Sequence, residues 1–288
     1  MSLINKSMMK FNHTEFKQRN MKIWNEIAPR YHKRWASVNE GPFQSTSKLI
    51  ELVNASKGSS VLDLACGTGV VTKKILEKVG NSGYVVGVDA SIAAIKIAKK
   101  WNGLKSNLDF LNIDAEKFSF SQKFDIITCQ YALFFFPNAQ KALKNIRSSL
   151  KKTGVLGISV HGHRDKVPFF SNILDAILEY IPDYVPAGTP NLDRFGTKSV
   201  LYNEVKKVGF TKISIKDFIF SYNPGKFDDY WKNYLKYIAK PLKEKLNSLD
   251  ISKRRKIRDL VKQNTAQYTK KNGDIIFPWQ VLILTAKY

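Results

Sequence analysis

Residues 61–69 (VLDLACGTG) are the stretch whose residue types and spacing most clearly suggest chemistry. An apolar run ends in Gly67 and Gly69, which carry no Cβ, so the backbone can approach a ligand closely. The turn leads into a predicted helix over 70–79, and the amides of a helix N-terminus favour an anionic group such as a carboxylate. The segment therefore predicts a ligand site at the carboxyl end of a strand.

Further polar residues follow the next apolar runs. Asp89 ends the run 84–88, about 20 residues after the glycine turn, where a carboxylate can accept hydrogen bonds from two ribose hydroxyls. Asp114 follows the run 108–113, and Gln130 and Tyr131 follow the run that begins at Phe124. In an open α/β sheet ligands bind beside the carboxyl ends of the strands, so we expect these side chains to gather there.

The spacing does not fit a dinucleotide-binding turn. That turn requires G-x-G-x-x-G, and the third position counted from Gly67 is Thr72. The residues instead resemble the first motif, D-x-[GA]-x-G-x-G, of the class I S-adenosylmethionine-dependent methyltransferases, although many members carry Gly where Ala65 stands. The resemblance covers about residues 20–160. It implies that S-adenosylmethionine binds to Asp63, Ala65, Gly67, Thr68, Gly69, Asp89, Ala90, Asp114, Ala115, Gln130 and Tyr131.

The resemblance also implies particular roles. In the family the residue at the position of Asp114 often meets the adenine amino group. Residues 24–31 (WNEIAPRY) resemble a segment that precedes the core in many small-molecule methyltransferases, including those of quinone biosynthesis. There a tyrosine at the position of Tyr31 helps to close over the cofactor. The alternative is that Trp24 and Tyr31 are ordinary packing residues.

Methyl transfer requires an aligned acceptor and, for some acceptors, a base. Aromatic faces can stabilise a sulfonium, and Tyr31, Tyr131 and Phe134 are candidates. His161 and His163 follow the run 155–160 at the ligand-facing edge, and a base role for either is a hypothesis. The alternative is that both are structural residues.

The two cysteines, Cys66 and Cys129, are too few for a disulfide framework. Together with the histidines they form no recognisable metal spacing, so we expect no metal site. We interpret them as small buried thiols, with redox sensitivity as the alternative. A chain without disulfides indicates a reducing cytoplasm.

Strands alternate with helices along the chain, which predicts an α/β fold with a parallel sheet and helices on both faces. Ser91 is the predicted N-cap of the helix 92–101. Residues 151–154 are predicted to form a turn, 182–196 a loop, and Pro278 a bulge or the edge start of a strand. Strands are expected at 60–64, 84–88, 108–113, 124–128, 155–160, 211–220 and 275–287, and helices at 12–35, 44–53, 70–79, 92–101, 138–150, 168–181, 199–208 and within 226–270.

The resemblance refines this to a Rossmann-like, doubly wound, mostly parallel seven-stranded sheet. Its order is 3-2-1-4-5-7-6, with the last strand antiparallel and helical lid additions. We divide the chain into an N-terminal helical lid (1–56), an S-adenosylmethionine-binding core (57–163) and the rest of the sheet (164–288). The last part carries acceptor-side helical insertions at 164–197 and 226–271.

The formal net charge is +23 over 288 residues. The excess is spread along the chain, at +6 over 1–60, +7 over 61–160 and +7 over 225–262, with one local run at 253–258. We interpret it as a solvated lysine-rich surface. No apolar run approaches the roughly 20 residues of a membrane span, and residues 1–20 lack the apolar region of a secretory signal.

The methyl acceptor is predicted to be a small molecule. Nucleic-acid amino methyltransferases of the family usually carry N/D-P-P-Y/F after the fourth strand, whereas residues 129–132 read Cys-Gln-Tyr-Ala. One alternative is an RNA or protein methyltransferase that uses the basic surface. Another is a cofactor-binding protein without catalysis. The sequence predicts neither the accepting atom nor the oligomeric state.

Overall fold

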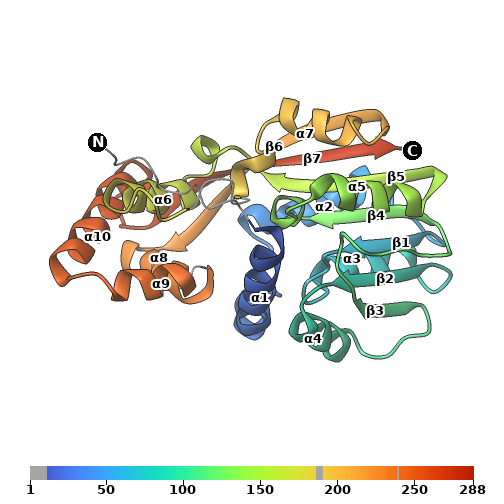
Figure 1. Ribbon diagram of the computed structural model, residues 1–288, viewed down its shortest axis with the longest axis horizontal. Coiled ribbons are helices and arrows are strands. Elements are labelled where there is room, and N and C mark those ends of the chain that lie inside the picture. The colour runs from blue at the N-terminus through green and yellow to red at the C-terminus, as the bar shows by residue number, and fades with distance from the viewer. Residues whose placement is uncertain (1–11, 186–190, 239) are drawn as a thin grey trace, which may run out of the picture.

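The computed structural model describes residues 12–185, 191–238 and 240–288 (Figure 1). The described residues form a seven-stranded sheet in the order β3-β2-β1-β4-β5-β7-β6. Strands β1 to β5 pair in parallel, and β7 runs antiparallel to β5 and β6. The predicted strand order is therefore confirmed. The strands are β1 (Ser60–Leu64), β2 (Tyr84–Asp89), β3 (Leu108–Asn112), β4 (Phe124–Gln130), β5 (Leu150–His161), β6 (Thr211–Gly225) and β7 (Ile275–Lys287).

Helices cover both faces of the sheet, because successive strand residues point to opposite sides. The helices are α1 (His13–Trp35), α2 (Ser45–Leu52), α3 (Val70–Val79), α4 (Ile92–Asn102), α5 (Ala139–Ser149), α6 (Pro168–Tyr180), α7 (Lys198–Lys206), α8 (Phe227–Asn233), α9 (Lys240–Asn247) and α10 (Ile251–Thr265). In β1, Val61 packs in one buried cluster with α2, α3 and α4, while Leu62 packs in a second cluster with α5 and α7.

Local sequence signals account for several helix starts. The Ser91 hydroxyl accepts a hydrogen bond from the amide of Ala94, as its predicted N-cap role requires. Asn138 caps α5 in the same way, through the amide of Lys141. The helix predicted over 226–270 consists of α8, a π turn (Tyr234–Ile238), α9 and α10.

The predicted turn at 151–154 is wrong, because β5 begins at Leu150 and stays extended. Phe124 pairs with Leu150 and Ile126 with Val155, so β5 takes up its extra residues as an irregularity. Gly154 permits this close approach, since a Cβ there would lie 2.6 Å from a methyl group of Leu150. The charged residues that suggested a turn instead face solvent, where Lys151 pairs with Asp125 at 2.8 Å.

Strands β6 and β7 are longer than the sheet core and extend to a helical end formed by α6, α8, α9 and α10 (Figure 1). β6 continues to Gly225, five residues beyond its predicted end, because it pairs with β7 as far as Ile275. Pro278 lies on this extension, opposite Ser221 and before pairing with β5 begins at Val281, as expected for an edge position. Of the predicted loop 182–196, residues 186–190 lie outside the described residues, and Leu192–Phe195 forms a short 3-10 helix.

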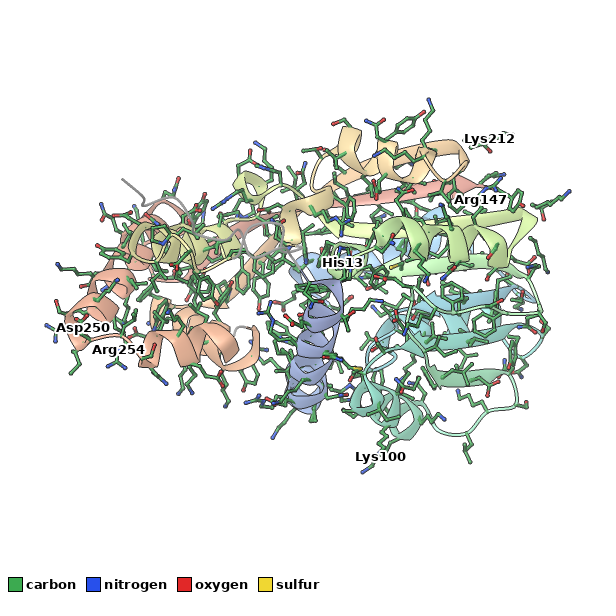
Figure 2. The ribbon with its side chains drawn as sticks, in the orientation of Figure 1. His13, Lys100, Arg147, Lys212, Asp250 and Arg254 are labelled. Carbon is green, nitrogen blue, oxygen red and sulfur yellow. The ribbon has the colours of Figure 1, made fainter. Side chains whose placement is uncertain are left out.

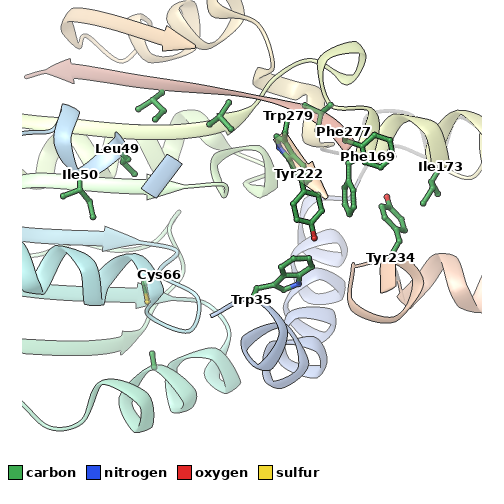
Figure 3. Close-up of a cluster of buried hydrophobic side chains, with 14 of the residues drawn as sticks. Trp35, Leu49, Ile50, Cys66, Phe169, Ile173, Tyr222, Tyr234, Phe277 and Trp279 are labelled. Carbon is green, nitrogen blue, oxygen red and sulfur yellow. The ribbon is translucent and has the colours of Figure 1, made fainter. Parts of the chain in front are cut away.

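Aromatic side chains fill the junction between the sheet and the helical end (Figure 3). Phe169 of α6 stacks on Trp279 of β7 with ring centroids 4.9 Å apart, and Tyr222 of β6 contacts both rings. The aromatic residues of the C-terminal half are therefore in large part core residues.

Positively charged side chains lie on several separate elements of the molecule. Figure 2 shows Lys100 on α4, Arg147 and Lys212 at the far end of the sheet, and Arg254 on α10. This agrees with the spread seen along the sequence. Within the described part of the chain, no helix combines the length and apolarity needed to cross a bilayer.

Candidate functional site

A cavity of about 720 Å³ lies at the carboxyl ends of β1, β2, β3 and β4 and is covered by α1. Its walls come from the loops that follow these strands and from one face of α1. It brings together the predicted residues Tyr31, Asp63, Ala65, Gly67, Thr68, Asp89, Ala90, Asp114, Ala115, Gln130 and Tyr131.

The two glycines of the first turn play different parts. Gly67 has φ +55°, and a Cβ there would meet none of the described atoms within 4 Å, so the turn presents bare backbone beside the cavity. Gly69 has φ +84°, and a Cβ there would lie 2.7 Å from Asn102 Nδ2. Gly69 is not among the described residues that line the cavity. Close packing at the N-terminus of α3 therefore explains why this position is a glycine.

Two non-glycine residues of the site have left-handed backbones. Ala65 has φ +56° and Tyr131 has φ +54°. Such conformations cost energy for residues with a Cβ and concentrate at functional sites. The amide of Tyr131 donates to Ser159 O at 2.9 Å, and its hydroxyl lies 2.8 Å from both Ser45 Oγ and Pro42 O. These contacts hold the strained residue in place.

Asp63 forms the floor of the cavity and is almost fully buried. Its carboxylate accepts hydrogen bonds from Thr72 Oγ1 at 2.6 Å and Thr128 Oγ1 at 2.8 Å. Burial raises the pKa of the Asp63 carboxyl to about 6, against the opposing effect of the two hydroxyls. Asp63 thus links β1 to β4 and α3 beneath the glycine turn.

Asp89 is fixed against the same turn. Its two carboxylate oxygens accept from the amides of Gly67 at 2.9 Å and Ser91 at 2.8 Å. Burial raises the pKa of Asp89, while these two bonds act in the opposite direction. A carboxylate has about four acceptor positions, so two remain for hydroxyl groups of a ligand.

At the other end of the cavity, Asp114 is paired with α1. Lys17 Nζ lies 2.9 Å from Asp114 Oδ2 and 2.7 Å from Glu116 Oε2. Burial opposes the charge of Lys17, but hydrogen bonds to Glu116 and Asp114 prevail and raise its pKa. The predicted adenine contact of Asp114 therefore has a competitor that the sequence did not reveal.

Two further polar contacts join α1 to the loops. Asn25 Oδ1 accepts from Ser91 Oγ at 2.7 Å and from the amide of Ala93 at 3.1 Å. His32 Nδ1 lies 2.9 Å from Thr68 Oγ1. With Lys17, these residues are spaced by eight and seven positions, which places them on one helix face. That spacing could have identified them as a polar stripe facing the cavity.

Aromatic rings form the wall beside this stripe. Trp24 contacts Tyr31 at 5.7 Å and Phe135 at 5.9 Å between centroids, and all three line the cavity. Burial raises the pKa of Tyr31 to about 12, so its hydroxyl stays protonated at neutral pH. Phe134, expected beside the sulfonium, instead packs in the opposite buried cluster, and Phe135 takes the place at the cavity.

The predicted bases lie elsewhere. His161 is buried behind Tyr131, with the two rings stacked 4.3 Å apart, and its Nδ1 accepts from Trp279 Nε1 at 3.0 Å. Burial lowers the pKa of His161 to about 3, so its neutral ring has no free acceptor nitrogen. His163 is exposed and lies 2.6 Å from Asp165. Neither histidine is among the described residues lining the cavity, and this geometry argues against a base role for either.

Cys66 and Cys129 are free and buried. Burial raises the pKa of each thiol above its usual range, so both remain protonated. Among the described residues, no group of three or more His, Cys, Asp or Glu side chains could hold a metal ion.

The cavity differs in charge from the rest of the molecule. Among the described residues that line it are four carboxylates and two lysines, although the chain as a whole carries +23. The carboxylates are Asp63, Asp89, Asp114 and Glu116. This lining suits a ligand that carries positive charge and hydroxyl groups.

Comparison with known proteins agrees with this geometry. Residues 55–179 match a family described as a methyltransferase domain. A ubiquinone biosynthesis O-methyltransferase of Coxiella burnetii is 30% identical over 193 residues, which cover 65% of this chain and 80% of the relative. A demethylmenaquinone methyltransferase of Lactococcus lactis is 35% identical over 154 residues. That match covers 52% of this chain and only 60% of the relative's own length.

Solved structures share the fold. A phosphoethanolamine N-methyltransferase of Haemonchus contortus in complex with S-adenosyl-L-methionine aligns over 97% of this chain and 60% of its own (TM-score 0.56, 15% identity). A methyltransferase of Thiobacillus denitrificans in complex with S-adenosyl-L-homocysteine aligns over 89% and 96% (TM-score 0.51, 16% identity). The Coxiella relative establishes the family, and the strand order and the cavity at the glycine turn agree with it. The chain belongs to the S-adenosylmethionine-dependent methyltransferase family, whose methyl donor is S-adenosylmethionine.

Proposed function

We propose that this protein transfers a methyl group from S-adenosylmethionine to a small-molecule acceptor. The observation that carries the proposal is the cavity itself, in which the glycine turn, Asp89 and an aromatic wall meet under α1. Its volume of about 720 Å³ lies in the range of sites for small ligands, roughly 300–1,000 Å³. The names of the two relatives given above also describe enzymes that methylate small molecules.

The residues present fit the methyl donor. Bare backbone at Gly67 and the N-terminus of α3 suit a carboxylate. The remaining acceptor positions of Asp89 suit ribose hydroxyls, and Asp114 would bind the adenine amino group in competition with Lys17. When bound, S-adenosylmethionine supplies an activated methyl group on a cationic sulfur.

This chain would contribute alignment and exclusion of water. α1 covers the cavity through Lys17, Asn25 and His32, which hold it to three different loops. Tyr31 and Tyr131 present aromatic faces to a cationic group, and the acidic lining supports the same charge. In a closed site of this kind, positioning of the reactants can lower the activation free energy by about 7–11 kcal/mol.

We propose an acceptor of the quinone type, in line with the names of the relatives. Both tyrosines at the cavity have a raised pKa through burial, so neither is ionised at neutral pH. Because neither tyrosine can act as an ionised base, the site suits an acceptor with an acidic proton of its own, such as a hydroquinone.

We also propose that residues 1–56 act as a lid and that the additions within 164–288 form the acceptor side around the core 57–163. We further propose that the protein works in the cytoplasm, where its buried thiols stay reduced. Among the described residues, we find no feature that favours an RNA or protein acceptor. The positive charge is spread over the surface, whereas the cavity lining holds more carboxylates than lysines.

The test uses purified protein, methyl-labelled S-adenosylmethionine and a whole-cell extract. Label in an organic-extractable or low-mass fraction supports a small-molecule acceptor and gives its mass. Label in a nuclease- or protease-sensitive polymer overturns the proposal in favour of the basic surface. Cofactor binding without any transfer would indicate a binding protein. An Asp89→Asn variant should label less when S-adenosylmethionine is limiting, whereas Asp109→Asn, which changes an exposed carboxylate on β3, should label like wild type.

A further inference from the structure

Two polar atoms near one end of the cavity are buried without a hydrogen-bond partner among the described residues. They are the indole nitrogen Nε1 of Trp35 and the amide oxygen Oε1 of Gln130. Both residues line the cavity, and Trp35 is only 6% exposed. An indole N–H can only donate and an amide oxygen can only accept. Buried groups of this kind are normally paired, so each calls for an explanation.

The two residues flank the same short segment. The ring of Phe43, in the 3-10 helix Gly41–Gln44, stacks on Trp35 with centroids 5.2 Å apart. A few residues later, the hydroxyl of Thr46 accepts from Gln130 Nε2 at 2.9 Å. Both side chains therefore lie at the end of the cavity beside residues 43–46.

Flat aromatic surfaces enclose this end. Trp35 packs against Phe43, against Tyr31 at 6.4 Å and against Tyr222 at 6.0 Å. In Figure 3 the indole of Trp35 lies below Tyr222 and points away from Cys66, which belongs to the glycine turn. In this view the ring of Trp35 therefore extends away from the glycine turn, which suits the donor's carboxylate.

We propose that Tyr31, Trp35, Phe43, Gln130 and Tyr131 form the acceptor site, here called the Trp35 slot, and that it takes a neutral hydroxylated aromatic ring. A ring oxygen accepts from Trp35 Nε1, and a ring hydroxyl donates to Gln130 Oε1. None of the five side chains is charged at neutral pH, so the slot selects an uncharged ring rather than an amine or a phosphate ester. This assignment rests on the proposed methyl transfer and adds the residues that recognise the acceptor.

The alternative occupant is the methionine end of the donor. Its carboxylate and ammonium would also pair with a donor and an acceptor, but they are charged, and both unpaired atoms are neutral. The glycine turn at the N-terminus of α3 already offers backbone amides to a carboxylate. The two occupants predict opposite outcomes when the N–H of Trp35 is removed.

The experiment measures binding by calorimetry to protein saturated with S-adenosylhomocysteine, without oxygen. The probes are 1,4-dihydroxynaphthalene and naphthalene, which differ in their hydroxyl groups. Wild-type protein should bind the diol more tightly. Trp35→Phe keeps a ring but removes the N–H, and should weaken diol binding by about threefold to tenfold, as expected for one neutral hydrogen bond. Naphthalene affinity should fall by less than diol affinity, because only the contact area of the smaller ring is lost, and S-adenosylhomocysteine affinity should stay unchanged.

Gln130→Met, which removes the acceptor, should show the same selective loss and protects the test if one variant fails to fold. Trp231→Phe, on α8 and away from the cavity lining, is the matched control and should bind as wild type. Equal diol affinity in Trp35→Phe and wild type, or failure of wild type to bind the diol, overturns the Trp35 slot. A selective loss of S-adenosylhomocysteine affinity in Trp35→Phe also overturns it, by assigning the N–H to the donor. Methyl transfer from the extract assay would in each case remain a separate result, so the two proposals can fail independently.

Discussion

Asp89→Asn is the most direct test of the donor site, because asparagine keeps the shape of the side chain and changes one oxygen into an NH₂ group. In the wild type the two oxygens accept from Gly67 and Ser91 at 2.9 and 2.8 Å. In the variant one of these amides faces a donor. The same change weakens the contacts that remain for ligand hydroxyls.

The magnitude follows from the number of bonds lost. A hydrogen bond to a charged group contributes about 1.5–3 kcal/mol. One such bond to the backbone is lost with or without ligand, but the variant also removes a buried charge whose raised pKa shows that it destabilises the fold, so the free energy of unfolding should change little at neutral pH. One contact to a ribose hydroxyl is lost only in the complex, so the dissociation constant should rise roughly 30-fold for a loss of about 2 kcal/mol.

The assay is isothermal titration calorimetry with S-adenosylhomocysteine, together with urea unfolding of the same samples. Asp109→Asn, which changes an exposed carboxylate on the neighbouring strand β3, controls for the lost charge and should bind like wild type. A folded Asp89→Asn protein with wild-type affinity would refute the assignment of Asp89 to the ribose.

Three further predictions concern α1, the glycine turn and the buried acid. Lys17→Met should speed dissociation of S-adenosylhomocysteine by up to about fivefold in stopped-flow and flatten its salt dependence. The reason is that the Lys17–Glu116 ion pair holds α1 over the cavity even where the ligand replaces Lys17 on Asp114, and a part-exposed pair contributes up to about 1 kcal/mol. An equal effect of the exposed control Lys22→Met would show that Lys17 does not hold α1 over the ligand. Gly69→Ala should destabilise the protein more than Gly67→Ala in urea unfolding, because only its Cβ would clash, at 2.7 Å, while Gly67→Ala should reduce cofactor affinity in calorimetry; a reversed order would show that the packing is misassigned. Burial raises the pKa of Asp63 from 3.8 to about 6, so wild-type stability should be fully present below pH 4 and decline as the pH rises through 6. Relative to wild type, Asp63→Asn should gain up to about 3 kcal/mol in free energy of unfolding between pH 4 and 7, and a pH-independent difference would show that Asp63 is not buried in its acid form.

Local patterns were sufficient to predict the order of the elements. The glycine turn, the N-cap at Ser91 and the alternation of strands and helices depend on residues close in the sequence, and the structure reproduces them. The family resemblance then supplied the strand order, which no local pattern contains. All but one of the predicted donor-binding residues line one cavity, because parallel strands bring their carboxyl ends to the same edge.

Tertiary structure alone decided how these residues are used. His161 follows a strand at the predicted edge, but Trp279, more than a hundred residues away, occupies its Nδ1 and burial keeps it neutral. Gly69 belongs to the motif, yet the side chain of Asn102 on another helix explains why it must be glycine.

The sequence by itself determined which residues could bind a nucleoside-type ligand, since a strand, a turn and the acids that follow are short-range features. Only the folded chain decided that α1 closes the site through Lys17, and that Trp35 and Gln130 bring unpaired polar atoms to its aromatic end. Such contacts join segments far apart in the chain, and their energies depend on burial and distance, which no single segment specifies.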